Sequence, residues 1–588
     1  TAKHNRINPL NAMIKRLFPI LEWLPEYNQS KFYGDLSAGL TVGVMLIPQG
    51  MAYAMIAGLP PVFGLYAAFI PQLIYALMGT SGKLGVGPVA MDSLLVASGL
   101  GALSLSGIDQ YIQMAVFLAL FMGAIQVLMG LLKMGFLVNF LSKPVISGFT
   151  SAAALIIGMS QLKHLLGTDI ERSNQIQHLL YNAFLTIDQI HLGTLTIGII
   201  GILGILILKK INPRIPAALV VTILGILAVW GFGMEQTGVK IVSNVPSGLP
   251  ELSLPSEFVL SNVNELFPIA LTLALVAFME AISVAKAVED EHSKLNLRPN
   301  QELIALGFAN VIGSFFQSYP TTGGFSRTAV NNQTGASTPM SLITSAAVVG
   351  ATLLFLTPLF YYLPNAVLAS IIMVVVFGLI DLKYPKRLWA YRKDEFGLLV
   401  FTFLVTLTVG ITQGILFGIL LSLLLMVYRT AQPHYAVLGN IKGSKYYRNI
   451  NRFKENVDED TEVLIFRFDA QLYFGNKDFF KSEISAQIET RKEGLKSIII
   501  NAESMNYIDS SGVFMLDKLL EKLQKQGYKV YIAGAIGPVR DIIKNSGLEE
   551  RIGSNFLFEN TYEAHLFIKQ NIEPDELHKK ISHQSSSM

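Results

Sequence analysis

Long apolar segments recur through most of the chain, and they end at glycine, proline or charged residues. Between Leu36 and Tyr428 they follow one another closely, with hardly a charge inside them. A helix needs about 20 apolar residues to cross the hydrocarbon of a bilayer. The pattern therefore predicts an all-α membrane domain over residues 34–430, with about fourteen spans. These begin near Leu36, Val62, Pro88, Tyr111, Phe136, Leu192, Ile215, Leu266, Gln301, Ser326, Met340, Pro364, Phe396 and Gln413.

Composition supports this assignment and narrows the chemistry. Hydrophobic residues are 51% of the 588 positions and charged residues are 15%, against about 25% charged in a typical soluble domain. Cysteine is absent, which excludes disulfides, thiolate metal sites and thiol nucleophiles. The nine histidines show no ligand spacing, and the formal net charge is only +3. We therefore expect no metal, no cofactor and no nucleic-acid partner.

Basic residues in the predicted loops indicate the orientation. They gather before the first span and after the second, sixth, eighth and twelfth, and such loops face the cytoplasm. We expect both termini to be cytoplasmic, in the cell (inner) membrane, with residues 1–33 forming an N-terminal segment that carries an interfacial helix at 13–24. No cleavable signal peptide is recognised in this segment. The basic residues are Lys15, Arg16, Lys83, Lys209, Lys210, Arg214, Lys286, Lys294, Arg298, Lys383, Lys386, Arg387, Arg392 and Lys393.

Two predicted spans, the third and the tenth, are interrupted. Residues 79–88, Gly-Thr-Ser-Gly-Lys-Leu-Gly-Val-Gly-Pro, and 318–327, Ser-Tyr-Pro-Thr-Thr-Gly-Gly-Phe-Ser-Arg, both read as extended, glycine-rich stretches that lead into a short helix. Irregular backbone is tolerated at membrane depth only where it is buried in protein or lines a cavity. The breaks are equivalent if the spans form two inverted seven-span repeats, which points to a midplane substrate site. Ordinary loops or tight helix packing are the alternative.

Helix N-termini that face each other favour an anion, because their N–H groups are unpaired and their dipole ends are positive. Arg327 adds a forked donor that suits an oxyanion, although it could lie at the interface or pair with Glu280. Glu280 lies in an apolar stretch that favours its neutral acid, so we expect it to carry a proton with the anion. Gln49 and Tyr53 share a helix face and offer an amide and a phenol, although helix packing would also explain them.

Three stretches resemble motifs of the SulP family of sulfate permeases and related anion transporters. They are Pro-Gln-Gly-Met-Ala-Tyr-Ala-Met at 48–55, Pro-Val-Phe-Gly-Leu-Tyr at 61–66 with Gly-Thr-Ser at 79–81, and Tyr-Pro-Thr-Thr-Gly-Gly-Phe-Ser-Arg at 319–327 followed by Ala-Val-Asn at 329–331. Phe63 stands where tyrosine is commoner, and Gly82 where a basic residue commonly follows the serine. The resemblance extends over nearly the whole chain.

This resemblance implies a secondary transporter rather than an enzyme, with a core and a gate domain, elevator-type alternating access and a homodimer. Glu280 matches the proton-coupling glutamate of plant-type sulfate symporters, which favours proton-coupled sulfate uptake. Bicarbonate or chloride exchange, a passive anion channel, and an anion-binding membrane sensor are the alternatives. The anion site that the resemblance implies is formed by Gln49, Tyr53, Gly87, Pro88, Val89, Ala90, Phe325, Ser326 and Arg327.

After Tyr428 the composition becomes that of a soluble protein. Strand patterns at 461–472, 496–501 and 528–533, with helical patterns at 511–526 and 539–546, predict a small α/β domain at 431–572. It resembles the STAS domain, the fold shared with anti-sigma factor antagonists, which implies a regulatory protein partner. Ile-Asp-Ser-Ser-Gly at 508–512 is similar to its phosphoacceptor turn, with Ser510 as acceptor, while capping of a helix by Ser510 is the alternative. Residues 573–588 are predicted to be disordered.

Overall fold

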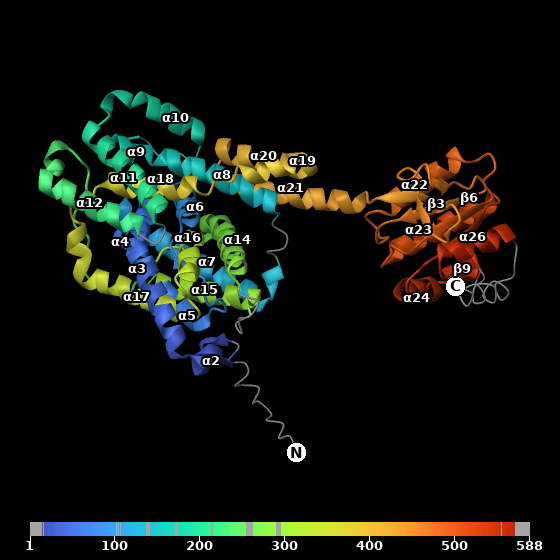
Figure 1. The fold of residues 1–588 in the computed structure, drawn as a ribbon, viewed down its shortest axis with the longest axis horizontal. Helices are drawn as coiled ribbons and strands as arrows, with labels where there is room; N and C mark the ends of the chain where they lie inside the picture. The colour runs from blue at the N-terminus through green and yellow to red at the C-terminus, as the bar shows by residue number, and fades with distance from the viewer. Residues whose placement is uncertain are drawn as a thin grey trace, which may run out of the picture. The chain divides into compact units, whose positions relative to one another are not determined.

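The computed structural model describes residues 14–15, 17–101, 103, 105, 107–136, 142–170, 175–212, 216–254, 263–289, 296–553 and 556–570. Two compact units make up the chain, a helical unit, Thr1–Ser422, and a smaller unit, Leu423–Met588 (Figure 1). The basic residues Arg16, Arg214 and Lys294 and the predicted disordered tail lie outside the described residues. The interfacial helix is described in part, as α2 (Ile20–Trp23) and the residues before it.

The described part of the first unit is mainly helical, and each of the fourteen predicted spans contains a helix. Seven of the described helices are long and apolar enough to cross a membrane, and shorter apolar helices accompany them. The number that crosses the bilayer stays a prediction. The helices that matter below are α3 (Gln29–Ala57), α4 (Val62–Ala67), α5 (Ile70–Met78), α6 (Ala90–Gly101), α7 (Ile108–Leu131), α8 (Lys143–Ser160), α11 (Leu192–Ile211), α12 (Ala217–Phe232), α14 (Val263–Ala287), α15 (Pro299–Ser314), α16 (Phe325–Gln333), α17 (Met340–Ala351), α18 (Asn365–Phe377), α20 (Lys393–Thr408) and α21 (Ile411–Ala431).

These helices pack as two groups. In the first group α6, α16 and α17 pack on α3, while α15 packs on α5 and α7, and α14 on α7. In the second group α8 packs on α18 and α20, and α11 on α12 and α18. Glycine permits the closest contacts: a Cβ on Gly64 would stand 1.9 Å from the carbonyl oxygen of Gly50, so only glycine lets α4 meet α3. This contact explains the glycines in the motifs at 48–55 and 61–66.

Two buried carboxylates fix the segments beside the interrupted spans. Glu302 on α15 accepts hydrogen bonds from Thr80 N (2.6 Å), Thr80 Oγ1 (2.5 Å) and Tyr75 Oη (2.8 Å). Asp35 on α3 accepts from the segment that follows α16. Its donors are Ser337 N (2.7 Å), Thr338 N (3.0 Å) and Thr338 Oγ1 (2.5 Å). Burial removes water from the oxygens of each carboxylate, and three hydrogen-bond donors replace it. A buried carboxylate that stabilises a fold needs such donors.

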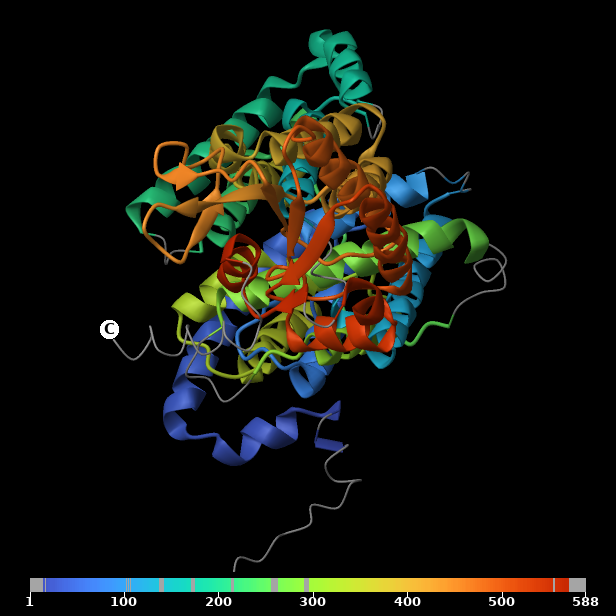
Figure 2. The same ribbon diagram turned by 90° about the vertical axis from the view of Figure 1, so that its right-hand side faces the viewer.

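The second unit is an α/β domain whose sheet has the strand order β4-β3-β6-β7-β8-β9, with β5 beside β3. The predicted strands and helices are confirmed, whereas the antiparallel β3 was not predicted. Helices α22 and α23 cover one face and α26 the other (Figure 2). The elements are β3 (Tyr435–Ile441), β4 (Tyr447–Asn449), β5 (Val457–Asp458), β6 (Val463–Phe468), α22 (Lys477–Thr490), β7 (Ser497–Asn501), α23 (Ser510–Lys525), β8 (Lys529–Ala533), α24 (Gly537–Asn545), β9 (Leu557–Phe558) and α26 (Thr561–Gln570).

The cap of α23 differs from the expected one. Asp509 is the N-cap residue, and its carboxylate accepts from Gly512 N at 2.7 Å and from Phe474 N at 2.9 Å. Ser510, the alternative cap in the sequence, is the exposed first residue of the helix instead. Capping by Ser510 is therefore wrong, because the carboxylate one residue earlier already satisfies the first N–H groups.

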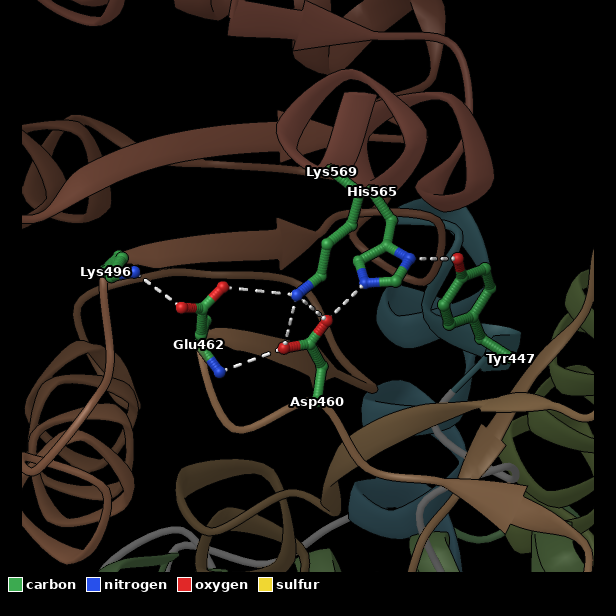
Figure 3. A network of polar contacts seen from close by, with 6 residues as sticks. All are labelled: Tyr447, Asp460, Glu462, Lys496, His565 and Lys569. Carbon is green, nitrogen blue, oxygen red and sulfur yellow. Dashed lines mark hydrogen bonds and ion pairs between the residues drawn. The ribbon is translucent and has the colours of Figure 1, made fainter. Parts of the chain in front are cut away.

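A polar network ties α26 to the strands beneath it (Figure 3). His565 joins Tyr447 Oη (2.9 Å) to Asp460 Oδ2 (2.9 Å), and Lys569 Nζ lies 2.8 Å from the same carboxylate and 3.4 Å from Glu462. Burial alone would raise the pKa of Asp460, but hydrogen bonds from Lys569 and His565 lower this pKa below its usual value. Asp460 therefore stays ionised at neutral pH and holds the last described helix in place.

Candidate functional site

The two interrupted spans meet through their extended segments. Strand β1 (Val86–Gly87) pairs antiparallel with β2 (Thr322–Gly323), with Val86 opposite Gly323. Gly324 N adds a hydrogen bond to Gly85 O at 2.9 Å. This short ladder gives the broken backbone the partners that lipid cannot supply. The interruptions predicted from the sequence are thereby confirmed, and their pairing is new.

Each strand leads directly into a short helix. Helix α6 begins at Ala90, three residues after β1 ends, and α16 begins at Phe325, two residues after β2 ends. The first turn of a helix has N–H groups without intrahelical acceptors and carries the positive end of the dipole. Because β1 and β2 lie side by side, both helix N-termini start from the same place in the unit. The arrangement can attract an anion from two sides.

Arg327 lies in the first turn of α16 and is the largest of the fully buried side chains, with 2% of its surface exposed. Its Nη1 donates to Pro88 O at 2.6 Å, which binds α16 to the segment before α6. Its Nε and Nη2 have no hydrogen-bond partner among the described residues. A buried guanidinium with two unused donors on one edge is ready for a bidentate oxyanion.

The glycines of the breaks make room for this guanidinium. A Cβ on Gly324 would lie 2.8 Å from Arg327 Nη2, closer than a methyl group can approach. A Cβ on Gly87 would lie 3.6 Å from the same atom. Space therefore requires glycine at 324, whereas the 3.6 Å contact at 87 is an ordinary van der Waals distance and glycine is favoured there by its φ of +152°.

A cavity of about 120 Å³ lies at the two helix N-termini. It offers several times the space that one water needs, enough for a small oxyanion. Most of the expected site residues line it, whereas Gly87 and Pro88 do not; Pro88 acts through its carbonyl and Gly87 lies against the guanidinium. The expected residues at the wall are Gln49, Tyr53, Val89, Ala90, Glu280, Phe325, Ser326 and Arg327.

Glu280 on α14 lines the same cavity as Arg327 without forming an ion pair with it in the described part of the chain. Its Oε2 is buried and has no hydrogen-bond partner there. The structure thus offers no support for a structural pair between the two residues. An unpartnered carboxyl group beside a cavity can exchange a proton with bound solvent.

The sequence did not identify the opposite wall of the cavity. It is formed by apolar and small polar side chains of α8, α18 and α21, which have no charge or glycine signal to mark them. These residues are Ile146, Phe149 and Thr150 of α8, Val375 of α18, Leu379 just after it, and Ile415 of α21. Only the folded chain brings them to face α3, α6, α14 and α16.

These features define a class of protein, a helical membrane transporter whose central cavity suits an anion and whose C-terminal unit is a separate α/β domain. Residues 32–402 match the sulfate permease family, and residues 447–564 match the STAS domain. The chain belongs to the sulfate permease family.

Curated relatives support this assignment over the whole chain. "Sulfate transporter 4.1, chloroplastic" of Arabidopsis thaliana is 35% identical over 99% of this chain and 86% of its own length. "High affinity sulfate transporter 2" of Stylosanthes hamata is 32% identical over 93% of this chain and 85% of its own length. The family and these relatives are transporters, not enzymes, so the protein is an integral membrane anion transporter.

Solved structures share the fold. The structure of SLC26A9 superposes with a TM-score of 0.87 at 25% identity, covering 97% of this chain and 95% of its own. The transmembrane domain of the cyanobacterial bicarbonate transporter BicA has a TM-score of 0.57 at 24% identity, covering 68% of this chain and 98% of its own. The second likeness concerns the fold alone.

Proposed function

We propose that the protein is a proton-coupled sulfate symporter that works by elevator-type alternating access. Sulfate binds between the N-termini of α6 and α16, held by Arg327 and the N–H groups of Ala90 and Ser326. The observation that carries this proposal is the buried guanidinium with two unused donors in a cavity at two helix N-termini. The names of the plant relatives favour sulfate as the cargo.

Further side chains would complete the anion site. Gln49 is 4% exposed, and its Oε1 has no partner among the described residues, so its amide is free to turn toward a ligand. Tyr53 is also 4% exposed and lies one helical turn further along the same face. The proposed site comprises Gln49, Tyr53, Gly87, Pro88, Val89, Ala90, Phe325, Ser326 and Arg327.

Glu280 would carry the coupling proton. In its neutral form it removes a negative charge from the neighbourhood of the bound sulfate, which lowers electrostatic repulsion inside the cavity. In its ionised form it competes with sulfate for the field of Arg327. Protonation on the side with the lower pH would therefore favour loading, and deprotonation on the other side would favour release.

The elevator motion is supported by the place of the cavity in the packing. One wall belongs to α3, α6, α14 and α16 of the first group, and the other includes α8 and α18 of the second group, so the cavity lies at the border between the two helix groups. Movement of the first group against the second would expose the site alternately to the two sides. We further propose a homodimer in the cell (inner) membrane, both termini cytoplasmic, and regulation through the STAS domain with Ser510 as a phosphorylation site.

Purified full-length protein in liposomes tests this function with labelled sulfate. An inward proton gradient should stimulate uptake above the rate without a gradient. Glu280→Gln should keep sulfate binding but weaken the pH dependence of uptake, because glutamine imitates the neutral acid. Flux that ignores the gradient contradicts symport, and stimulation by an opposing bicarbonate or chloride gradient would assign exchange instead. Sulfate binding without any flux would assign a sensor.

A further inference from the structure

A second buried carboxylate stands beside the anion site. Asp92 lies in the first turn of α6 and is completely buried. Neither of its carboxylate oxygens has a hydrogen-bond partner among the described residues. Asp35 and Glu302, which are equally buried, have three donors each. Asp92 therefore lacks the hydrogen bonds by which a buried carboxylate stabilises a fold.

The neighbours of Asp92 belong to the site. Ala90 and Met91, just before it, line the cavity, and Ser93, just after it, shares a hydrogen bond of 3.0 Å with Tyr319 Oη. Tyr319 belongs to the segment that leads into β2. Asp92 thus lies within the framework that joins the two interrupted spans.

Charged groups on two of the neighbouring helices act on Asp92. The charges of Glu280 on α14 and Arg327 on α16 act on it, and it acts on Tyr319. Tyr53 on α3 interacts with Arg327 and Tyr319. The charged residues of α7 and α8 are Asp109 and Lys143, and both lie in the first turns of their helices. Among the residues that the structure describes, the cavity and its immediate surroundings thus hold one permanent cation, Arg327, and two carboxylates, Glu280 and Asp92.

The charge state of Asp92 must affect anion binding. An ionised carboxylate in the first turn would cancel the positive helix end that favours sulfate, and without partners it would be costly to bury. A neutral Asp92 leaves the helix end available. Binding of a dianion therefore favours protonation of both Asp92 and Glu280.

We propose that Asp92 is a second proton-carrying residue, so that each sulfate moves with two protons. This inference rests on the proposed symport. With both carboxylates ionised and Arg327 positive, the empty site carries one negative charge. With both protonated and sulfate bound, it again carries one negative charge, so loaded and empty carriers cross under the same electrical force. The protons add to the carboxylate oxygens from the water on the loading side and leave to the water on the other side.

Proton uptake by the wild-type protein tests this count without a mutation. Purified protein in weakly buffered detergent solution is titrated with sulfate over about pH 5.5 to 8.5, where sulfate stays a dianion, and a pH indicator counts protons taken up per sulfate bound. We expect the maximum across this range to exceed one. A maximum that never exceeds one overturns the inference, and a maximum of zero also contradicts proton-linked binding by Glu280.

Variants then assign the second proton. Asp92→Asn should still bind sulfate but take up at most one proton per sulfate, and uptake into liposomes should depend less steeply on proton concentration. Asp109→Asn is the matched control, because it removes an exposed acid from the first turn of α7 and should leave the count unchanged. An unchanged count in Asp92→Asn, with wild-type uptake still driven by the proton gradient, overturns the role of Asp92 while the proposed symport stands.

Discussion

Replacing Arg327 by lysine separates the charge of the guanidinium from its geometry. The variant keeps a cation at the first turn of α16 but loses the planar fork. In the structure Nη1 is occupied by Pro88 O, while Nε and Nη2 remain for the ligand. A lysine side chain ends in a single donor nitrogen, so it can replace at most one of these two donor nitrogens and cannot also keep the bond to Pro88 O.

The magnitude follows from the number of donors. A hydrogen bond to a charged group contributes about 1.5–3 kcal/mol. Loss of one of the two ligand donors should therefore weaken sulfate binding roughly 10- to 150-fold. Alanine removes both donors and the charge, which corresponds to about 3–6 kcal/mol, or at least about a hundredfold loss of affinity.

Calorimetric titration of purified protein with sulfate measures both variants. Arg392→Lys is a matched control, because Arg392 is exposed and paired with Glu395 at 3.2 Å outside the cavity lining. A melting temperature close to that of the wild type shows that each variant is folded. Wild-type affinity in a folded Arg327→Lys protein would refute the bidentate role of the guanidinium.

Three further predictions concern stability. Gly64→Ala should destabilise the helical unit by about 1–3 kcal/mol, because the methyl group of the alanine would collide with the backbone of α3. Gly397→Ala is the control, because the space around Gly397 is open and its stability should not change. Thermal melting in detergent measures both variants. Asp509→Ala should cost the STAS domain about 1 kcal/mol through the lost cap, and Ser510→Ala close to nothing, by chemical denaturation. The pKa of Asp460 is lowered in the folded state, so its stabilising effect is present at neutral pH and lost as acid titrates it. The protection of the α26 amides, measured as their exchange rate relative to the intrinsic rate at each pH, should therefore fall on acidification, and in Asp460→Asn it should be low already at neutral pH.

The sequence predicted the interrupted spans because a bilayer imposes a strict rule on backbone. A glycine-rich extended stretch inside an apolar region must be buried in protein, and so the stretches 79–88 and 318–327 could be recognised without a structure. The cation at Arg327 stood out for the same reason, since an arginine at membrane depth is costly. Such features are local, and one chain is enough to show them.

Partners in space could not be predicted in this way. The ladder between β1 and β2 joins residues that are more than two hundred positions apart, and the wall from α8, α18 and α21 consists of ordinary apolar residues. Asp92 looks like a common first-turn acid until its oxygens are seen to lack donors. The cap of α23 was assigned to Ser510 rather than Asp509 because both are good caps and only the helix start distinguishes them.

The most direct test of the anion site is a structure of the protein with bound selenate, a tetrahedral dianion whose heavy atom marks its own position. The peak should lie in the cavity, within hydrogen-bond distance of Arg327 Nε and Nη2 and of the first N–H groups of α6 and α16. A selenate bound elsewhere at saturating concentration, with this cavity empty, would contradict the account.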